Sequence, residues 1–463
     1  MSDTLMISVS GMRGHVGTDL TPELVARHAA AFGAWVRESA SDGRAPAVVL
    51  GRDARTSGPM FTRAAAAGLM SVGVDAIELG IVPTPTVQMA VEHHHAGGGL
   101  ILTASHNPIE WNALKFVGPD GIFLDAASGA RVRALAAQGP PRMGWKGLGE
   151  AREDAEAIAR HLDAIFGLSM IDVAAIRRRQ FHVALDCVRG AGATAMLPLL
   201  DRLGCRVSGI NLETDGLFPR PPEPVPENLG ELGQLVRSSG AAIGLAVDPD
   251  ADRLALVDET GRPIGEDYTL AFAVRAVLHG RPSRDGSSAA TPPTVVANLS
   301  TSLVVDDAAR AAGARLLRAP VGEANVARAI RDEGAVIGGE GNGGVILPAL
   351  HIGRDAPLGV ALILHLLATT GLTVSSLVNA SPRYTIVKAK GPLGSELGPM
   401  YARLRERFHD AEPDERDGLR LSWRDSWLHV RPSGTEPIVR LIAEAPTAEA
   451  AERLVGAARE LSH

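Results

Sequence analysis

Short apolar runs alternate with longer stretches of helical periodicity through most of the chain. Runs of about four to eight apolar residues bounded by polar loops are typical of buried strands, and apolar residues spaced three or four apart are typical of helices. Three successive sets share one order of strand, helix, strand and strand, with strands at 47–50, 74–79 and 99–102, at 182–185, 206–210 and 242–247, and at 294–297, 315–317 and 335–337. The pattern predicts three α/β units built on one plan. In such sheets, ligands bind at the polar loops that follow the carboxyl ends of the strands.

The remainder of the chain, from about residue 373, has a different pattern. Residues 384–388, 418–423 and 426–431 alternate apolar and polar positions, as antiparallel strands with one solvated face do. Residues 448–461 have the apolar spacing of an amphipathic helix. We therefore predict four domains, the last of them α+β, with boundaries at 1–152, 153–253, 254–373 and 374–463.

Composition narrows the class of protein. The chain has 463 residues, and its 46 Lys and Arg against 53 Asp and Glu give a formal charge of −7, which argues against a nucleic-acid partner. Its 51 Gly and 30 Pro indicate many tight loops. Cys187 and Cys205 are the only cysteines, so a disulfide framework is excluded and we expect a cytoplasmic location. The longest apolar stretch, residues 357–372, contains His365 and predicts a buried helix rather than a membrane span.

Three aspartates follow the third strand of the second unit. Asp248, Asp250 and Asp252 lie at alternate positions, so their carboxylates can converge on one hard cation such as Mg²⁺ or Ca²⁺. A calcium-binding helix–loop–helix site is disfavoured, because Arg253 stands at the sixth position, where that loop needs glycine, although Glu259 stands at the twelfth. The other interpretation is a solvated acidic turn. The buried strand before the triplet favours the metal site.

A serine follows the third strand of the first unit. After Ser105, residues 107–110 read Asn-Pro-Ile-Glu, the pattern of a helix start with an N-cap, proline at the first position and glutamate at the third. The unpaired N–H groups of a helix N-terminus favour a phosphate. The other interpretation is that Ser105 and Asn107 only cap the helix. Lys115 is either a proton-transfer group or charge partner, or a surface lysine.

Three further loops carry candidate binding groups. Residues 431–437 read Arg-Pro-Ser-Gly-Thr-Glu-Pro and offer a guanidinium, two hydroxyls and a glycine, a set that suits a phosphate monoester. Arg13 lies between glycines, and Glu340 lies in a run with five glycines from residue 338 to 344. Each motif alone is also compatible with an ordinary turn. The adjacent histidines at 93–95 are not expected to share a metal, because their rings diverge on a helix.

Together the loops are more specific than any one of them. In order along the chain they read Thr-Ala-Ser-His-Asn-Pro at 103–108, Asp-Pro-Asp-Ala-Asp-Arg at 248–253, Gly-Glu-Gly-Asn-Gly-Gly at 339–344 and Arg-Pro-Ser-Gly-Thr-Glu-Pro at 431–437. This set resembles the α-D-phosphohexomutase family over essentially the whole chain. The resemblance implies an α/β fold of three similar domains with mixed sheets, plus a C-terminal α+β domain with an antiparallel sheet, around a central cleft. It implies interconversion of hexose 6-phosphates and 1-phosphates through a phosphoserine and a bisphosphate intermediate.

The resemblance also implies roles for the matching residues. The resemblance implies that Ser105 is the phosphoserine and that it binds Mg²⁺ together with Asp248, Asp250 and Asp252. Those that match basic residues of the family's reaction centre are Arg13, Lys115 and Arg253. Those expected to contact substrate are Glu340, Asn342, Glu323, Arg431, Ser433, Gly434 and Thr435. The implied partner is a small sugar phosphate, with a hexose 1,6-bisphosphate as activator, and the expected assembly is a monomer or homodimer without nucleic acid or membrane.

Smaller features favour one sugar. Residues 319–323, Ala-Pro-Val-Gly-Glu, are similar to the phosphoglucosamine mutases of the family, and so is Ala104, where phosphomannomutases often have glycine. Many phosphomannomutase/phosphoglucomutase members have a histidine where this chain has Gly344. We expect conversion of glucosamine 6-phosphate to glucosamine 1-phosphate, with Glu340 and Glu323 facing the ammonium group.

Three other functions compete with this one. The first is a phosphomannomutase/phosphoglucomutase, and Asn342 does not decide between the sugars. The second is a metal-dependent sugar phosphatase that uses the same phosphoserine chemistry. The third is a non-catalytic sugar-phosphate binding protein, in which the loops recognise the ligand but no phosphoryl group moves.

Overall fold

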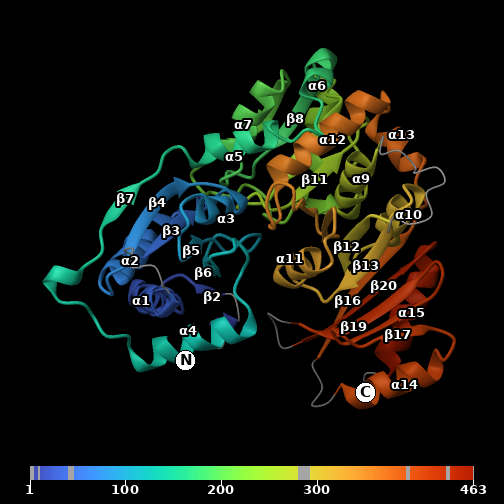
Figure 1. Ribbon diagram of the computed structural model, residues 1–463. Coiled ribbons are helices and arrows are strands. Elements are labelled where there is room, and N and C mark those ends of the chain that lie inside the picture. Colours follow the sequence, from blue (N-terminus) through green and yellow to red (C-terminus); the bar gives the residue numbers. More distant parts are fainter. Residues whose placement is uncertain are drawn as a thin grey trace.

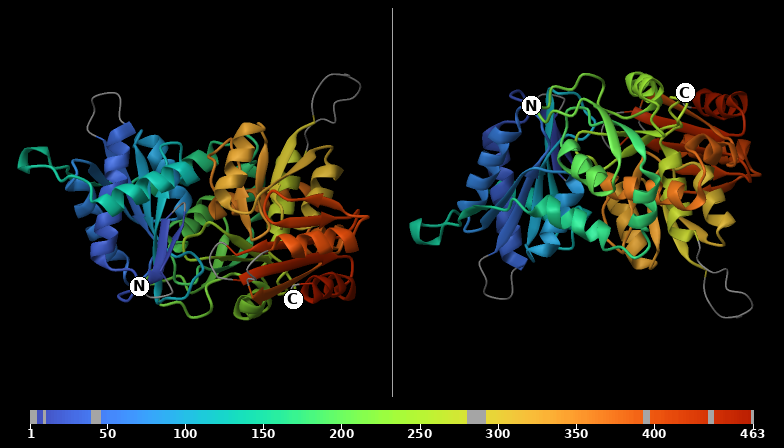
Figure 2. Two further views of the ribbon diagram at one scale, coloured as in Figure 1. Left: turned by 90° about the horizontal axis from the view of Figure 1, so that it is seen from below. Right: turned by 90° about the horizontal axis from the view of Figure 1, so that it is seen from above.

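The chain folds into four units, each with its own β-sheet (Figure 1). The computed structural model describes residues 5–8, 11–39, 46–279, 292–392, 397–433 and 438–461. Figure 1 shows the units following one another in chain order, from the first (blue) through the second (green) and third (yellow and orange) to the last (red), and Figure 2 shows the same order from above and below. Three α/β units and an antiparallel C-terminal sheet confirm the predicted fold class.

The first three sheets share one strand order. Each has three parallel strands and a fourth that returns antiparallel to the third, so the order across the sheet is fourth, third, first and second. In the first unit these strands are β3 (Ala47–Arg52), β4 (Asp75–Ile81), β5 (Gly98–Leu102) and β6 (Trp111–Val117). In the second they are β8 (His182–Asp186), β9 (Arg206–Ile210), β10 (Ile243–Val247) and β11 (Leu254–Val257). In the third they are β12 (Thr294–Asn298), β13 (Arg315–Ala319), β14 (Ile337–Glu340) and β15 (Gly344–Ile346). The first sheet is extended at its edges by β1 (Met6–Ser8), β2 (Gly11–His15) and β7 (Ala151–Glu153).

This strand order explains where the polar loops lie. The turn from the third strand to the returning fourth strand holds residues 103–110 in the first unit, 248–253 in the second and 341–343 in the third. All three turns therefore lie at the carboxyl end of a central strand, where an open α/β sheet binds its ligands. The strands β5 and β10, which lead into the first two turns, are buried along their whole length. A strand fixed in the core thus positions each loop.

Helices cover the faces of the sheets. They are α1 (Pro22–Ser39), α2 (Gly58–Met70), α3 (Thr84–His93), α4 (Ala126–Gln138), α5 (Ala157–Phe166), α6 (Val173–Arg179), α7 (Ala193–Arg202), α8 (Gly230–Ser239), α9 (Asp267–Leu278), α10 (Leu303–Ala311), α11 (Glu323–Asp332), α12 (Ala356–Thr370), α13 (Val374–Asn379), α14 (Gly398–Arg407) and α15 (Ala448–Glu460), with 3₁₀ turns η1 (Trp145–Gly147) and η2 (Pro226–Asn228). The predicted buried helix is α12, which is buried from Ala356 to Leu367. Among the described helices, none combines the length and the apolar run that a membrane crossing needs.

The C-terminal sheet is antiparallel throughout. Its order is β16 (Thr385–Pro392), β20 (Ile438–Ala445), β19 (Trp427–Pro432), β18 (Leu419–Ser422) and β17 (Glu412–Asp414). The three predicted strands correspond to β16, β18 and β19, whereas β20, which pairs with both β16 and β19, is not among them. The predicted closing helix is α15.

Buried polar groups join this last unit to the third. Glu444 on β20 is fully buried and accepts hydrogen bonds from Ser302 Oγ, from the backbone N–H of Leu303 at 2.8 Å and from Trp427 Nε1 at 2.6 Å. Because Ser302 is the N-cap of α10, Glu444 helps to satisfy the start of that helix. The C-terminal unit is therefore anchored to a helix end of its neighbour.

A buried histidine at this junction is expected to make the stability of the protein depend on pH. His429 Nε2 donates to the carbonyl oxygen of Asp417 at 2.7 Å, so its Nδ1 accepts the hydroxyl of Ser300 at 2.8 Å. Burial lowers the pKa of His429 from 6.5 to about 4. Between these values the unfolded chain binds a proton that the folded chain excludes, so stability falls as the pH falls from 6.5 to 4. At about 1.4 kcal/mol per pKa unit, we expect a loss of about 3 kcal/mol between pH 7 and pH 4.

Urea unfolding followed by tryptophan fluorescence measures this loss, because Trp427 lies on the same strand as His429. His429→Gln should flatten the slope of stability against pH over this window, whereas His409→Gln, at an exposed position, should leave it unchanged. An unaltered slope in His429→Gln would show that other groups cause the pH dependence.

The predicted helix start at residues 107–110 is wrong. These residues form a turn, and the chain then enters β6, which pairs with both β2 and β5. The carbonyl oxygens of Asn107 and Pro108 accept hydrogen bonds from a buried arginine side chain rather than from a helical backbone. Because strand pairing on both sides of β6 satisfies its backbone, the capping pattern of the local sequence is overridden.

Candidate active site

The serine of the first unit meets the aspartates of the second. Ser105 is buried and adopts a φ of +48°, a left-handed conformation that is uncommon for a residue with a side chain. Its Oγ donates a hydrogen bond to Asp248 Oδ2 at 2.9 Å. Asp248, Asp250 and Asp252 are each 0% exposed. The predicted phosphoserine and the predicted metal ligands therefore lie together.

The aspartate triplet has the donor atoms that a divalent cation needs. Its ligand oxygens lie within 4.8 Å of one another. Among the described residues, Asp250 Oδ1 and Asp252 Oδ1 are buried and have no hydrogen-bonding partner. Burial, followed by the charges of Asp252 and Asp250, raises the pKa of Asp248 well above its ordinary value. A hard cation with oxygen ligands satisfies the free oxygens and compensates the crowded charge, so the residues fit Mg²⁺.

The three predicted basic residues surround this cluster. Lys115 Nζ donates to Asp250 Oδ2 at 2.8 Å, so its interpretation as a surface lysine is wrong. Arg13 donates to Asn107 Oδ1 at 2.6 Å, and burial lowers the pKa of Arg13. Arg253 is 8% exposed and its Nε lies 4.0 Å from Asp248 Oδ2. Three cations beside one hydroxyl create a site for an anion.

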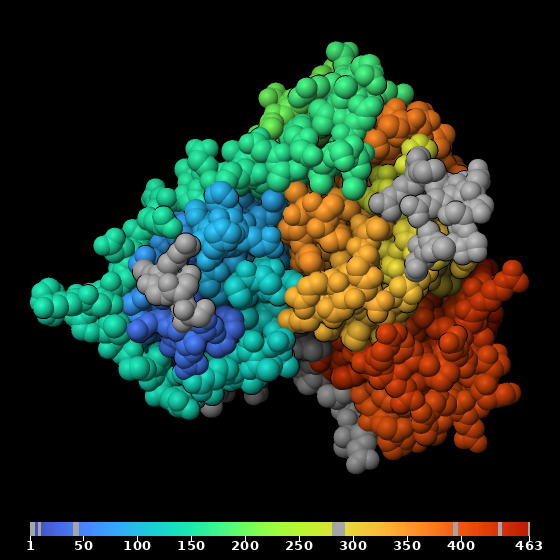
Figure 3. All heavy atoms as spheres, viewed as in Figure 1, coloured from blue at the N-terminus to red at the C-terminus, as the bar shows by residue number. Residues whose placement is uncertain are grey.

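These residues line a cavity between the first and third units. Its volume is about 420 Å³, and its wall includes Ser105, Arg13, Lys115 and Arg253 together with Glu323 from the third unit. Figure 3 shows the surfaces of the first unit (blue and cyan) and the third unit (yellow and orange) meeting side by side. The cavity therefore brings a hydroxyl and several cations to one space of the size of a small ligand.

An arginine outside the predicted set holds the serine loop. Arg55 is fully buried, and each of its five N–H donors has an acceptor: Asp53 Oδ2 at 2.9 Å and the carbonyl oxygens of Ser105 at 2.7 Å, Asn107 at 2.6 Å, Pro108 at 2.6 Å and Trp111 at 2.8 Å. Asp53 also accepts from Thr103 Oγ1 at 2.7 Å, and that oxygen accepts from the backbone N–H of Ser105 at 2.9 Å. The left-handed conformation of Ser105 is thus fixed from both sides.

A second arginine outside the predicted set joins the loop at 248–253 to the loop at 339–344, which we call the metal loop and the sugar loop after the roles that the resemblance implies. Arg354 donates to Asp252 Oδ2 at 2.5 Å, Glu323 Oε2 at 3.1 Å and Glu340 Oε2 at 2.9 Å. Burial opposes its charge, but the three carboxylates outweigh burial and raise the pKa of Arg354 well above its ordinary value. The one feature of the sequence that could have pointed to Arg354 is its position directly before Asp355, the N-cap residue of α12.

The predicted sugar contacts differ in their exposure to the cavity. Glu323 begins α11 and lines the cavity, and burial raises its pKa. Glu340 ends β14 and accepts from Asn298 Nδ2 at 2.9 Å and from Gly322 N–H at 3.0 Å; burial opposes its charge, but Arg354 and these donors lower its pKa. Asn342 Oδ1 accepts from the N–H of Gly344 at 3.3 Å and so closes the turn of the sugar loop. Neither Glu340 nor Asn342 is among the described residues that line the cavity.

A side chain at position 344 would collide with Arg354. A Cβ added to Gly344 would lie 2.2 Å from Arg354 Cδ. We expect Gly344→Ala to displace the guanidinium from Glu340 and Asp252 and to lower kcat/KM by about tenfold to a hundredfold, measured with the hexose-phosphate interconversion that the resemblance implies. Gly456→Ala is the control, because a Cβ there meets nothing within 4 Å. Equal activity of the two variants would show that Arg354 does not position the site.

Arg431 begins the loop that is expected to hold phosphate, and its contacts tie the C-terminal unit to the third unit. Arg431 Nε donates to Asp417 Oδ2 at 2.9 Å, and the same oxygen accepts the backbone N–H of Val321 at 3.0 Å. The residue after Val321 lines the cavity, so Arg431 lies near its rim. Ser433 follows β19. The other two predicted residues of this loop lie outside the described residues, namely Gly434 and Thr435.

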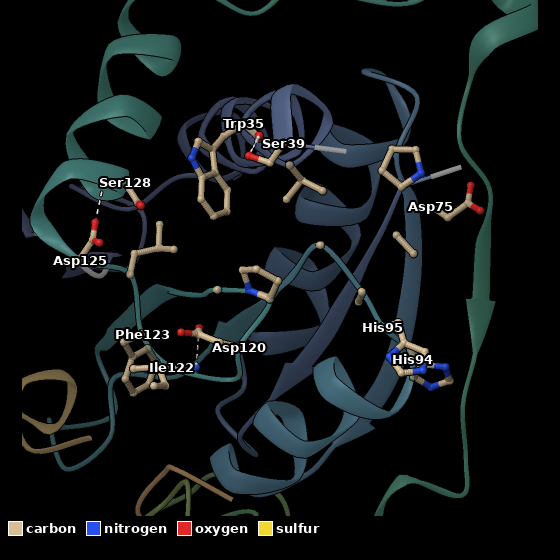
Figure 4. Close-up of a pocket in the computed structure, with 18 of the residues that line it drawn as sticks. Trp35, Ser39, Asp75, His94, His95, Asp120, Ile122, Phe123, Asp125 and Ser128 are labelled. Carbon is tan, nitrogen blue, oxygen red and sulfur yellow. Dashed lines mark hydrogen bonds between the residues drawn. The ribbon is translucent and has the colours of Figure 1, made fainter. Parts of the chain in front are cut away.

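A second cavity, of about 660 Å³, adjoins the first and is lined mostly by the first unit, with Arg328 and Arg331 of the third (Figure 4). It is lined by Trp35 from α1, by His94 after α3 and by the residues at which two parallel strands begin, Ala47 and Asp75. None of the predicted site residues is among the described residues of its wall. Because α/β sheets bind ligands at the carboxyl ends of their strands, we assign the active site to the smaller cavity at the serine loop.

Comparisons with known proteins agree with this site. The models for phosphoglucomutase/phosphomannomutase domains match in order: α/β/α domain I at residues 5–142, domain II at 159–261, domain III at 266–384 and the C-terminal domain at 401–461. A phosphoglucomutase/phosphomannomutase of Thermococcus kodakarensis is 38% identical over 445 residues, covering 95% of this chain and 94% of that protein. A phosphoglucosamine/phosphogalactosamine mutase of Sulfurisphaera tokodaii is 31% identical over 466 residues, covering 98% of each.

A solved structure agrees as well. The crystal structure of a phosphoglucomutase/phosphomannomutase family protein from Burkholderia thailandensis superposes with a TM-score of 0.82 at 27% identity, covering 98% of this chain and 97% of that one. The family models together span more than half of the chain, and both relatives match nearly its full length. The chain therefore belongs to the phosphoglucomutase/phosphomannomutase family of phosphohexomutases.

Proposed function

We propose that this enzyme interconverts hexose 6-phosphates and hexose 1-phosphates with Ser105 as the phosphorylated residue, and that it prefers glucosamine phosphate. The observation that carries the proposal is the hydrogen bond from Ser105 Oγ to Asp248 inside a triplet of buried aspartates. Ser105 therefore has carboxylates that can bind a metal ion on one side, and the positively charged side chains of Lys115, Arg13 and Arg253 around it. Such a setting suits the transfer of a phosphoryl group, which depends on positioning and on charge stabilisation.

Each phosphoryl transfer has a part for the residues of this chain. Mg²⁺ held by the aspartates would stabilise charge on the transferred group. The phosphoserine gives its phosphoryl group to the free sugar hydroxyl: the Oγ–P bond breaks as the new O–P bond forms, and the proton lost by the sugar hydroxyl is balanced by the proton that Ser105 Oγ gains. The resulting hexose 1,6-bisphosphate then turns around and returns its other phosphoryl group to Ser105. Arg13, Lys115 and Arg253 bind the phosphoryl oxygens in both steps, and Arg431 holds the phosphate that does not react.

Carboxylates near the cavity support an amino sugar. Glu323 lines the cavity, and Glu340 is joined to it through Arg354. A carboxylate at the sugar position compensates the positive charge of the ammonium group of glucosamine. Glucose and mannose have an uncharged hydroxyl at that position and need no such compensation.

The two free cysteines, Cys187 and Cys205, support a cytoplasmic location for the enzyme.

A side-by-side assay tests the proposal. Glucosamine, glucose and mannose 6-phosphates are each supplied with Mg²⁺ and a trace of the matching 1,6-bisphosphate, and 1-phosphate and inorganic phosphate are both measured. We expect 1-phosphate to form fastest from glucosamine 6-phosphate, with little free phosphate. Inorganic phosphate outpacing the isomer would favour a sugar phosphatase, and binding without either product would favour a sugar-phosphate binding protein. A faster reaction with the other sugars would overturn the sugar preference alone.

A further inference from the structure

A second cluster of metal-ligating side chains lies away from the active site. His161 on α5, His351 before α12 and Asp355 at the N-cap of α12 have side-chain exposures of 0%, 1% and 0%. Their ligand atoms lie within 4.8 Å of one another. Thr86 on α3 contacts His161, so the cluster joins the first unit to α5 and to α12. Figure 1 shows α5 beside α3 and α12, and both pairs of helices are in contact.

The two imidazole rings converge on one carboxylate oxygen. Asp355 Oδ2 lies 2.8 Å from His161 Nε2 and 3.0 Å from His351 Nε2. The two ring planes are 82° apart, an edge-to-face arrangement. Metal–ligand bonds of about 2.1 Å that meet at right angles place neighbouring ligand atoms about 3 Å apart. The nitrogen–oxygen separations are therefore those of three ligands on one face of a metal ion.

The surroundings hold these ligands in place. His161 Nδ1 is 2.9 Å from Thr86 Oγ1, and a proton on Nδ1 leaves the lone pair of Nε2 directed at the carboxylate. Asp355 Oδ1 accepts the backbone N–H of Leu358 at 2.9 Å, which fixes the carboxylate at the start of α12. Such contacts behind His161 and Asp355 orient ligands in metal sites and fix the histidine tautomer, whereas His351 Nδ1 is buried and, among the described residues, has no hydrogen-bonding partner.

We propose that His161, His351 and Asp355 bind a divalent transition-metal ion of the zinc class at the junction of these three elements. Two imidazoles and one carboxylate are a ligand set that such ions prefer, whereas Mg²⁺ prefers oxygen ligands alone, so this site and the aspartate triplet select different metals. Because the three ligands are almost completely buried, the ion would join the three elements rather than meet the substrate. The proposal does not depend on the sugar or on the reaction.

The bound ion would also stiffen the active site. Asp355 directly follows Arg354, whose guanidinium bonds Asp252 and Glu340. An ion that fixes Asp355 therefore fixes the backbone from which Arg354 reaches the metal loop and the sugar loop. His161, on an element outside the third unit, ties this backbone to the rest of the molecule.

Metal content tests the proposal on the full-length protein. The chain is loaded with Zn²⁺ in the presence of excess Mg²⁺, desalted and analysed by mass spectrometry of the elements. Because the aspartate triplet can also take up zinc, we compare His351→Gln, which breaks the histidine cluster, with Asp250→Asn, which breaks the triplet. We expect Asp250→Asn to retain one zinc per chain and His351→Gln to lose it, and His161→Gln should behave as His351→Gln does.

Two further readouts distinguish a ligand role from a fault in folding. Cobalt loading should give visible absorption bands that persist in Asp250→Asn and are absent from His351→Gln. Thr86→Val keeps all three ligands and should weaken zinc binding by about tenfold to a hundredfold while leaving the circular dichroism spectrum unchanged. Zinc retained by His351→Gln at the wild-type level, or lost from Asp250→Asn, would overturn the proposal and leave the cluster as a hydrogen-bonded one.

Discussion

Ser105→Ala is expected to abolish the interconversion of hexose 6-phosphate and 1-phosphate, with a loss of roughly 10⁴- to 10⁶-fold, the scale seen when a catalytic nucleophile is removed. The reason is chemical, because a mutase of this kind needs an oxygen that gives a phosphoryl group and takes one back. Two hydroxyls bond the aspartate triplet, Ser105 Oγ at 2.9 Å and Thr84 Oγ1 at 2.8 Å, and of these two residues only Ser105 is among the described residues that line the cavity. The rate is measured by a coupled assay of 1-phosphate, in parallel with transfer of labelled phosphate from hexose 1,6-bisphosphate to the protein.

Ser238→Ala is the matched control, since Ser238 is exposed on α8, and it should retain both activity and labelling. The alanine at position 105 removes one hydrogen bond to Asp248 and no packing partner of consequence, so the variant should fold and still bind the bisphosphate. Near-normal turnover in Ser105→Ala would refute the phosphoserine mechanism. Lost turnover with unchanged labelling would move the phosphorylated residue elsewhere.

Much of this site could be predicted because each motif follows a strand. The triplet at Asp248 and the loop at Ser105 stand directly after buried apolar runs, and such runs fix where a chain emerges at the edge of a sheet. The contact between Ser105 and the aspartate triplet could not be derived from either apolar run alone, because it depends on how the first and second units pack together. What local pattern predicts is the position of a loop on its own sheet.

The errors arise where tertiary contacts override local preference. Residues 107–110 have the composition of a helix start, yet Arg55 takes the carbonyl oxygens there and β6 pairs on both sides. Arg55 lies two residues after Asp53, in a loop that follows a strand. This spacing indicates an ion pair between the two side chains, but it does not indicate that Arg55 also bonds the carbonyl oxygens of the serine loop. For Arg354, the sequence offered one signal, its position directly before the N-cap residue of a helix. Apart from Asp53, the acceptors of Arg55 come from a segment about fifty residues away, so the sequence around Arg55 does not indicate them.

Arg55→Lys is expected to lower kcat by about a hundredfold with little change in KM, because it loosens the serine loop without touching the substrate. A lysine ammonium has three donors at one point, so it cannot satisfy Asp53 and the four carbonyl oxygens that the planar guanidinium reaches. Arg55→Met should also destabilise the protein by about 3–5 kcal/mol, since it leaves the buried Asp53 carboxylate without its partner. Steady-state kinetics and chemical unfolding measure the two effects separately.

Hydrogen exchange separates a positioning role from a purely structural one. In Arg55→Lys the backbone amides of residues 103–112 should exchange faster than in the wild type, while those of β10 and its aspartate loop keep their rates. Arg52→Met is the matched control: among the described residues, the one hydrogen bond of the Arg52 side chain goes to the Asp53 carbonyl oxygen, at 3.2 Å, and none goes to the serine loop. If Arg55→Lys keeps the wild-type kcat, the left-handed conformation of Ser105 is maintained by Thr103 alone. If both kcat and exchange change, the five donors of one side chain hold the phosphorylated residue in the geometry that transfer requires.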